Sequence, residues 1–403
     1  PTDAPAKVAE AFRQLRTGRP RPVALEMPLD QLAEACSVDL LDAATDHARP
    51  PVDEDALAKA AKLLAGAKAP MIFVGSGAVD SGEAIQALAE MLQAPVIANR
   101  TGRGIVSHRH YLSMMHLEGH RLWADADVVL AIGSRLQPAR MNWGTDDNLK
   151  IIHVDIDPVE IKRIAAPDVA LVGDAQDIVP ALVDAVGKQA PSRASREDEL
   201  VTLQGEVHKM LLDRLGPQMS WIKVIREALD DDGIFVDELT QVGYVSRVAM
   251  PVYQPRKYLS SAYQGTLGCG LGVAIGAKIA NPERQVLSIN GDGGFMYNVQ
   301  ELATAAKYNV NVVAIVFADG AFGNVRRMQE ELYDGRTIAS DLHNPDFVKM
   351  AESFGCAAYR AESPDELAKV LPTAFKQSGP AVIEVPFPKT PDPWPIIIPG
   401  RNR

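Results

Sequence analysis

Two acidic side chains stand close behind apolar runs in the C-terminal half of the sequence, and their positions suggest metal chemistry. Asp292 lies in Gly291-Asp292-Gly293-Gly294, just after the apolar run Val286 to Ile289. Asp319 follows a second, β-branched run, Val310 to Phe317. Such short apolar runs with polar edges are typical of buried strands. Between them, Asn298-x-x-Glu301 predicts a capping box that opens an amphipathic helix ending near Tyr308.

A strand–helix–strand crossover makes the two strands parallel, so their carboxyl ends share one edge of the sheet, where ligands of open α/β sheets bind. Two carboxylates brought together there would repel each other, and a divalent cation would remove the conflict. Mg²⁺ commonly takes carboxylate and phosphate oxygens, and glycines let backbone N–H groups approach a phosphate. The residues therefore predict a Mg²⁺–diphosphate site. The alternative is a tight glycine turn and an unrelated surface aspartate.

The order of these motifs resembles the thiamine-diphosphate motif, in which Gly-Asp-Gly is followed by a strand–helix–strand and usually by Asn-Asn. The resemblance implies that Asp292, Asp319 and the backbone carbonyl of Ala321 bind the metal. The sequence departs from the pattern at Ala318-Asp319, where Asn-Asn is usual. Asp319 still supplies an oxygen, with an extra negative charge, but the loss of the first Asn removes an amide that stabilises the turn.

Further motifs of the same family extend the resemblance. Thr240-Gln241 falls where the family carries Gly-Gln, a diphosphate contact. Gly265-Thr266-Leu267-Gly268 resembles Gly-Thr-Met-Gly, whose apolar residue wedges under the bent cofactor; the alternative for Leu267 is an ordinary core residue. Asn324 and Met328 are expected to line the substrate funnel. The predicted cofactor-binding residues are Thr240, Gln241, Gly265, Leu267, Gly291, Asp292, Gly293, Gly294, Asp319, Ala321, Phe322 and Asn324.

Composition bounds the class of protein. The 403 residues suggest two to three domains, and their apolar and charged fractions are ordinary for a globular chain. A net charge of -11 without a basic stripe argues against a nucleic-acid partner. Three widely spaced cysteines favour a reduced, cytoplasmic chain over a disulfide framework. We find no run of membrane-spanning length and no signal peptide.

Alternating apolar runs and helical patterns predict an α/β protein with two doubly wound parallel-sheet domains. Residues 53–185 resemble the central domain of the family, and residues 205–390 its diphosphate-binding domain. Residues 1–30, with a helix over Val8 to Arg16 and a strand over Val23 to Pro28, resemble the end of its pyrimidine-binding domain. Linkers over 31–52 and 186–204 and a tail over 391–403 complete the division. Gly268, Gly272 and Gly276 recur every four residues and predict close packing of a helix against the sheet.

The central domain raises the question of a second cofactor. It resembles that of the acetohydroxyacid synthase and pyruvate oxidase group, where some members bind FAD, others ADP, and many neither. Gly75-Ser76-Gly77 follows a predicted strand, yet the full dinucleotide fingerprint is absent. The acidic pair that usually follows the middle strand is also absent, because this stretch runs from Gly133 to Arg140 as GSRLQPAR. FAD therefore stays an open alternative.

The resemblance implies a thiamine-diphosphate- and Mg²⁺-dependent decarboxylase or carboligase of the acetolactate synthase type. In that chemistry a carbanion at C2 of the cofactor attacks a 2-oxo acid, and loss of CO₂ leaves an enamine. The catalytic glutamate of the family lies on its pyrimidine-binding domain, so no catalytic base is assigned here, and the chain alone is expected to be incomplete as an enzyme. Expected partners are a 2-oxo acid and either a second copy, in a homodimer or homotetramer, or a chain supplying that domain. The alternatives are a non-catalytic binding or regulatory subunit and a flavin-dependent 2-oxo acid oxidase.

Overall fold

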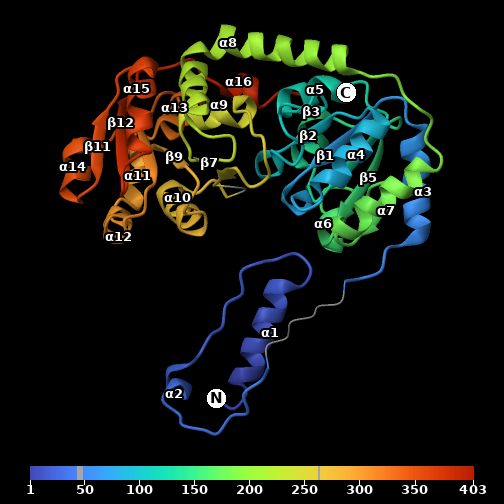
Figure 1. The fold of residues 1–403 in the computed structure, drawn as a ribbon, viewed down its shortest axis with the longest axis horizontal. Coiled ribbons are helices and arrows are strands. Elements are labelled where there is room, and N and C mark those ends of the chain that lie inside the picture. The colour runs from blue at the N-terminus through green and yellow to red at the C-terminus, as the bar shows by residue number, and fades with distance from the viewer. Residues whose placement is uncertain (43–48, 262–263) are drawn as a thin grey trace.

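Two parallel six-stranded sheets organise the protein, whose computed structural model describes residues 1–42, 49–261 and 264–403. The strand order is β3-β2-β1-β4-β5-β6 in the first sheet and β11-β12-β10-β9-β7-β8 in the second. Every strand pair in both sheets is parallel. Helices cover both faces of each sheet (Figure 1). The predicted α/β fold with two doubly wound sheets is confirmed.

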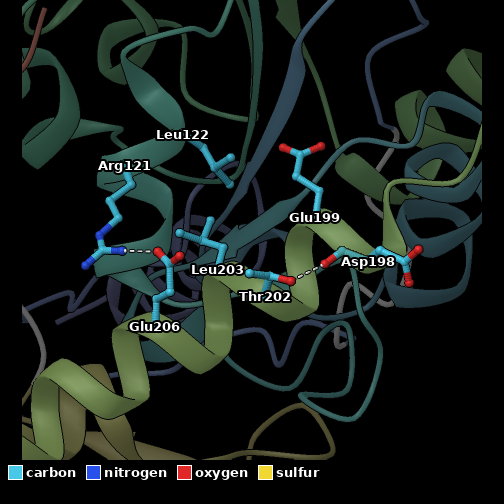
Figure 2. A pocket seen from close by; sticks show the side chains of 7 residues that line it. All are labelled: Arg121, Leu122, Asp198, Glu199, Thr202, Leu203 and Glu206. Carbon is cyan, nitrogen blue, oxygen red and sulfur yellow. Dashed lines mark hydrogen bonds and ion pairs between the residues drawn. The ribbon is translucent and has the colours of Figure 1, made fainter.

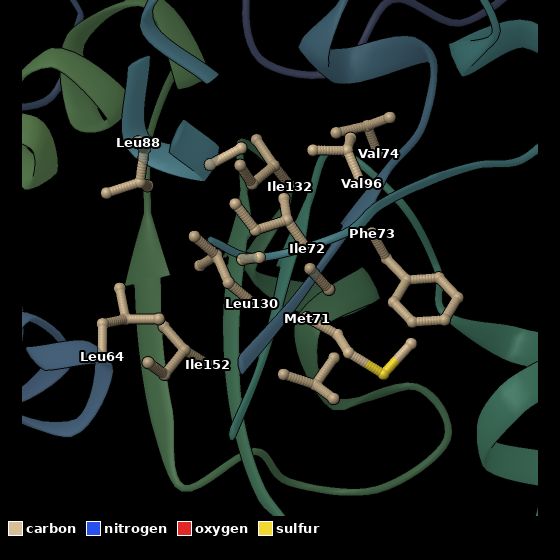
Figure 3. Packing of buried hydrophobic residues seen from close by; sticks show 14 of the residues in the cluster. Leu64, Met71, Ile72, Phe73, Val74, Leu88, Val96, Leu130, Ile132 and Ile152 are labelled. Atoms are coloured by element: carbon tan, nitrogen blue, oxygen red, sulfur yellow. The ribbon is translucent and has the colours of Figure 1, made fainter. Parts of the chain in front are cut away.

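The first sheet is built around a buried layer shared by its strands and two helices. Its strands are β1 (Pro70–Val74), β2 (Val96–Ala98), β3 (Ser113–Met114), β4 (Val128–Ile132), β5 (Lys150–Asp155) and β6 (Val169–Val172). Its helical segments are α3 (Glu54–Gly66), η1 (Ser76–Ala78), α4 (Gly82–Leu92), η2 (Arg100–Gly102), α5 (His116–Trp123), η3 (Ala139–Trp143), α6 (Pro158–Lys162) and α7 (Ala175–Gly187). Figure 3 shows Ile72, Leu130 and Ile152 of three neighbouring strands, with Leu64 of α3 and Leu88 of α4 in the same cluster.

The second sheet is buried on both faces. Its strands are β7 (Ile234–Asp237), β8 (Tyr258–Ser260), β9 (Val286–Gly291), β10 (Val313–Ala318), β11 (Ala357–Arg360) and β12 (Ala381–Pro386). Its helices are α9 (Gln241–Ala249), α10 (Cys269–Ala280), α11 (Asp292–Tyr297), α12 (Glu301–Lys307), α13 (Gly323–Leu332), α14 (Phe347–Ser353), α15 (Pro364–Ala374) and α16 (Trp394–Ile397). Along β10, Ile315 and Phe317 join one apolar cluster while Ala314 and Val316 join another, because successive side chains point to opposite faces.

A single long helix, α8 (Glu197–Ala228), runs along one side of the molecule between the two sheets (Figure 1). It bends at Leu215, which has non-helical backbone angles two residues before Pro217. Residues 197–204 of the linker predicted over 186–204 are thus the helical start of α8. The sequence of α8 is largely polar, but some of its side chains, such as Leu200 and Val207, are buried. No described helix, α8 included, combines the length and apolar character needed to cross a membrane.

The N-terminal residues form an arm that lies apart from both sheets in Figure 1. It contains α1 (Ala4–Arg16), as predicted, and the short α2 (Leu29–Leu32). The strand predicted over 23–28 is wrong: these residues are irregular and exposed, since no described strand lies beside them to complete a ladder. An ion pair of 3.0 Å from Arg19 Nη1 to Glu160 Oε1 joins the arm to α6. Residues 43–48 of the predicted linker lie outside the described residues.

Candidate functional site

The two predicted aspartates lie on adjacent loops at the carboxyl edge of the second sheet. Strands β9 and β10 pair in parallel, with Gly291 opposite Phe317. Asp292 opens α11 directly after β9, and Asp319 follows β10. The backbone N–H of Gly320 donates a hydrogen bond of 2.8 Å to Asp292 Oδ2, so the two loops are joined at this point. The structure therefore brings Asp292 and Asp319 together, as the crossover argument predicted.

The environment of the pair favours a cation. Asp292 is 2% exposed, whereas Asp319 is more open to solvent. Partial removal from water and the nearby Asp292 carboxylate raise the pKa of Asp319 to about 6. The carbonyl of Ala321 belongs to the same loop and adds a neutral oxygen. Two carboxylates and one carbonyl form the oxygen set that Mg²⁺ accepts, so these residues fit the metal.

The loop around Asp319 is held by a segment that the sequence did not point to. Asn344 Nδ2 donates a hydrogen bond of 2.6 Å to Asp292 Oδ2. The N–H of Phe322 donates to the carbonyl of Ser340, and the N–H of Leu342 donates to the carbonyl of Gly320, both at 2.8 Å. These bonds fix the loop although Ala318 replaces the usual asparagine. Sequence reasoning missed Asn344, because nothing local marks a residue 52 positions beyond its partner.

The predicted diphosphate contacts Thr240 and Gln241 lie at the start of α9. Thr240 caps this helix, since its Oγ1 accepts a hydrogen bond of 2.8 Å from the N–H of Gly243. Gln241 is the first residue of α9, and its buried Oε1 has no hydrogen-bond partner among the described residues. A Cβ on Gly291 would stand 3.4 Å from the carbonyl oxygen of Leu239. A polar side chain with unused capacity thus lies beside a tight glycine turn, which fits a phosphate-bearing ligand.

The turn that carries Leu267 is held by a residue that sequence reasoning missed. Gly265 and Gly268 have φ angles of +63° and +82°, which glycine adopts without strain. Glu238, at the end of β7, accepts the N–H groups of Gly268 at 2.8 Å and Gly270 at 3.0 Å. Leu267 is partly exposed and belongs to none of the three buried apolar clusters of described residues. An ordinary core role for Leu267 is therefore not supported.

Two local predictions near this turn are wrong. Gly272 and Gly276 face open space, with no atom within 4 Å of an added Cβ. The close approach is at Gly270 instead, where a Cβ would stand 2.3 Å from Asn290 Oδ1. The capping box at 298–301 does not form either, because the Asn298 side chain donates to the carbonyl of Gly268, and α12 begins at Glu301.

The side of the site next to α13 combines aromatic and polar groups. Phe322 stacks on Tyr297 with ring centroids 6.3 Å apart, and a Cβ on Gly293 would lie 2.4 Å from the Phe322 ring. Asn324 Oδ1 accepts hydrogen bonds of 3.3 and 3.2 Å from Arg327. Met328 is exposed on the same helix. These residues could contact a substrate at the outer side of the metal loop.

Among the residues that the structure describes, the first sheet offers no comparable site for a dinucleotide. Its crevice would lie between β1 and β4, where the strand order reverses. A Cβ on Gly75 would stand 2.3 Å from the carbonyl oxygen of Gly133, and a Cβ on Gly77 would stand 2.8 Å from the Cα of Gly133. The two turns thus pack backbone against backbone, and β1 is followed by the three-residue η1 rather than by a helix able to bind a phosphate. These residues do not fit a flavin.

A separate surface hollow of about 540 Å³ lies between α5 and α8 (Figure 2). It is lined by Arg121, Leu122, Asp198, Glu199, Thr202, Leu203 and Glu206. An ion pair of 3.0 Å joins Arg121 to Glu206 across it. It contains none of the predicted site residues.

Comparison with known proteins agrees with this geometry. The C-terminal TPP binding domain of thiamine pyrophosphate enzymes matches residues 240–385, and their central domain matches residues 57–182. A probable 2-ketoarginine decarboxylase of Pseudomonas aeruginosa is 33% identical over 403 aligned residues, covering 96% of this chain and 70% of the relative. The chain belongs to the thiamine pyrophosphate enzyme family. It is an enzyme of this thiamine-diphosphate-dependent type, and the family resemblance inferred from its motifs is confirmed.

Other relatives in the family are acetolactate synthases. The large subunit of acetolactate synthase isozyme 1 of Escherichia coli is 29% identical, with 98% of this chain and 72% of the relative covered. A probable acetolactate synthase large subunit of Methanococcus aeolicus is 32% identical, with 93% and 68% covered. The relatives thus carry at least two differently named activities on the same pair of domains.

Proposed function

We propose that this thiamine pyrophosphate enzyme is a Mg²⁺-dependent decarboxylase or carboligase of 2-oxo acids, similar to acetolactate synthase. The observation that carries the proposal is the joining of the two loops by the bond from Gly320 to Asp292. It places Asp292, Asp319 and the Ala321 carbonyl at one sheet edge. The named relatives support the substrate class, since 2-ketoarginine is itself a 2-oxo acid.

In this proposal each part of the site has a separate task. Asp292, Asp319 and the Ala321 carbonyl would hold the metal, and Thr240 and Gln241 would contact the diphosphate. Leu267 supports the cofactor rings, while Asn324 and Met328 border the substrate. Bound thiamine diphosphate supplies the electron sink for decarboxylation, which no protein side chain offers. The protein residues bind and orient the reactants.

The binding step can be tested with Asp292→Asn. We expect the intact chain to bind thiamine diphosphate in the presence of Mg²⁺ and to release it on chelation. Loss of an outer partner of a metal site typically costs 10- to 100-fold, so loss of a ligand charge should weaken binding on the order of 100-fold. Isothermal titration calorimetry measures both effects. Asp334→Asn, at a side chain that is 95% exposed beyond α13, is the matched control and should bind like wild type.

A non-catalytic binding or regulatory subunit is the second candidate, favoured by the replacement of the usual asparagine by Ala318. Turnover of a 2-oxo acid distinguishes the enzyme from the non-catalytic subunit. A wild-type chain that binds the cofactor but turns over no 2-oxo acid from a panel, with a pyrimidine-binding domain present, would favour this second candidate. Failure to bind thiamine diphosphate with Mg²⁺ present would remove the first candidate and favour a regulatory subunit that keeps the fold without the chemistry.

Assembly belongs to the same proposal: a homodimer or homotetramer, or a complex with a chain that supplies a pyrimidine-binding domain. Apolar side chains are exposed on α11 and α13 beside the site, namely Met296, Tyr297, Val325, Met328 and Leu332. Exposed apolar side chains that gather beside a site favour an interface. We expect light scattering to give a mass of two or four chains, and a monomer at all concentrations would contradict self-assembly.

A further inference from the structure

Glu238 is a buried carboxylate between the two glycine turns of the cofactor site. It is fully buried at the end of β7, and burial raises its pKa. Its Oε1 accepts the N–H of Gly268 at 2.8 Å, and its Oε2 accepts the N–H of Gly270 at 3.0 Å. No ion pair to Glu238 occurs among the described residues. The carboxylate is therefore held by two backbone donors at the start of α10.

The glycines around Glu238 show how closely the carboxylate is enclosed. A Cβ on Gly294 would stand 1.9 Å from Glu238 Oε1, and one on Gly270 would stand 2.7 Å from Oε2. Gly294 belongs to the Gly-Asp-Gly-Gly turn that begins with Gly291, whereas Gly270 follows the turn of Leu267. One side chain thus touches both turns and sets the spacing between them.

Asn298 holds the same turn from the opposite side. Its Nδ2 donates a hydrogen bond of 2.8 Å to the carbonyl of Gly268. Gly268 is consequently anchored at its N–H by Glu238 and at its carbonyl by Asn298. The preceding residue is Leu267, whose position depends on this anchored backbone.

The carboxylate of Glu238 does more than fill space between the two glycine segments. Burying an unpaired carboxylate is unfavourable unless hydrogen bonds compensate, and an apolar side chain would fill the same volume without that penalty. The N-terminus of α10 provides both free N–H donors and a favourable dipole. The two oxygens of the carboxylate offer one acceptor to each of these donors.

We propose that Glu238, assisted by Asn298, is a positioning residue that fixes the Leu267 turn against the Gly-Asp-Gly-Gly turn, so that Leu267 meets the cofactor rings. The inference rests on the proposed function, because it names how this chain would orient thiamine diphosphate. It assigns Glu238 to the ring side of the site and leaves the metal and diphosphate to Asp292 and Asp319.

The test uses two probes on the intact chain, Mg²⁺ with thiamine diphosphate and Mg²⁺ with inorganic diphosphate. Glu238→Gln keeps the volume beside Gly294 and Gly270, but its amide nitrogen must face one of the two N–H donors. Loss of a hydrogen bond to a charged acceptor corresponds to about a 10- to 100-fold change in affinity. We expect that loss for thiamine diphosphate and no change for inorganic diphosphate. Without ligand, the amides of Gly268 and Gly270 should also exchange hydrogen faster.

Two further variants provide a second test and a control. Asn298→Ala removes the other anchor of Gly268 from a half-buried position and should show the same selective loss, which keeps the test informative if Glu238→Gln folds poorly. Glu118→Gln in α5 is the matched control, because Glu118 is also a buried glutamate, 5% exposed, and lies outside the site. It should bind both probes like wild type.

Each remaining outcome is decisive. If Glu238→Gln and Asn298→Ala bind both probes normally, or lose both equally, the positioning role is wrong. If wild type binds the two probes with equal affinity, Leu267 does not contact the rings, and the inference fails while the metal–diphosphate part of the proposed function stands. If wild type binds neither probe, the proposed function fails and the inference fails with it.

Discussion

Asp319 should make metal binding depend on pH. Its pKa is raised to about 6 by partial removal from water and by Asp292, so the carboxyl takes up a proton as the pH falls through about 6. Mg²⁺ affinity should then drop on the acid side. Asp319→Asn keeps an oxygen ligand, carries no titratable charge and restores the residue usual in the family. We expect this variant to bind Mg²⁺–diphosphate at neutral pH and to show a weaker acid drop, measured by calorimetry between about pH 7 and 5.

Unfolding in the absence of metal provides an independent control for this prediction. The folded pKa of Asp319 lies above the unfolded value of 3.8, so the folded state binds the proton first as the pH falls. The free energy of unfolding contributed by this group should therefore rise as the pH falls from about 6 to about 4, and Asp319→Asn should lack this rise. Urea titrations with chelator would show it. Equal pH profiles for wild type and variant would contradict the assignment.

Some residues of the candidate site could be predicted from the sequence, and others could not. Asp292 and Asp319 were predicted together because each stands next to a recognisable strand, and parallel pairing then determines which edge they share. Glu238, Asn298 and Asn344 were missed because their contacts are made 30 to 52 positions away in the chain. The spacing of Asn298 to Glu301 predicted a capping box, but the Asn298 amide instead donates to the carbonyl of Gly268.

At the scale of elements, the sequence predicted the buried strands correctly, but it also predicted a strand over residues 23–28, which are irregular. The apolar runs of β1, β4, β9 and β10 identify them, since strands covered on both faces are apolar almost throughout. The run over 23–28 is also mostly apolar but has no strand beside it among the described residues, so it stays irregular. The first half of α8 has the opposite property: its polar surface is typical of a linker, and tertiary packing of a few apolar residues makes it a helix.

At the scale of the whole molecule, several connections besides α8 hold the two sheets in place. Arg103, in the loop after η2, is fully buried against the second unit: its Nη1 donates 2.9 Å to the carbonyl of Ser246, and its guanidinium lies 4.3 Å from the ring centroid of Tyr258. Tyr258 in turn donates to Asp237, the neighbour of Glu238 in β7. The first sheet is thus connected to β7, the strand that directly precedes Glu238.

The C-terminal tail makes a further connection, which the prediction of a tail over 391–403 did not include. Beyond β12 and α16 the chain crosses to the first sheet, where Arg403 Nε pairs with Asp146 at 2.7 Å and Nη1 donates 3.0 Å to the carbonyl of Trp123. The Arg403 side chain is only 8% exposed there, and its backbone N–H bonds to the carbonyl of Trp143.

Removing the Arg403 side chain should therefore loosen the two units without unfolding either. Arg403→Ala removes the cation that pairs with Asp146 Oδ2 and the donor to the carbonyl of Trp123, which should cost about 1–3 kcal/mol of unfolding free energy and lower the midpoint of thermal unfolding. Calorimetry should show the transition broadening toward two steps, because the sheets would unfold more independently. Lys389→Ala, at an exposed position between β12 and the tail, is the control and should leave the transition unchanged. A single sharp transition at the wild-type midpoint would mean that α8 and Arg103 are sufficient to hold the units together.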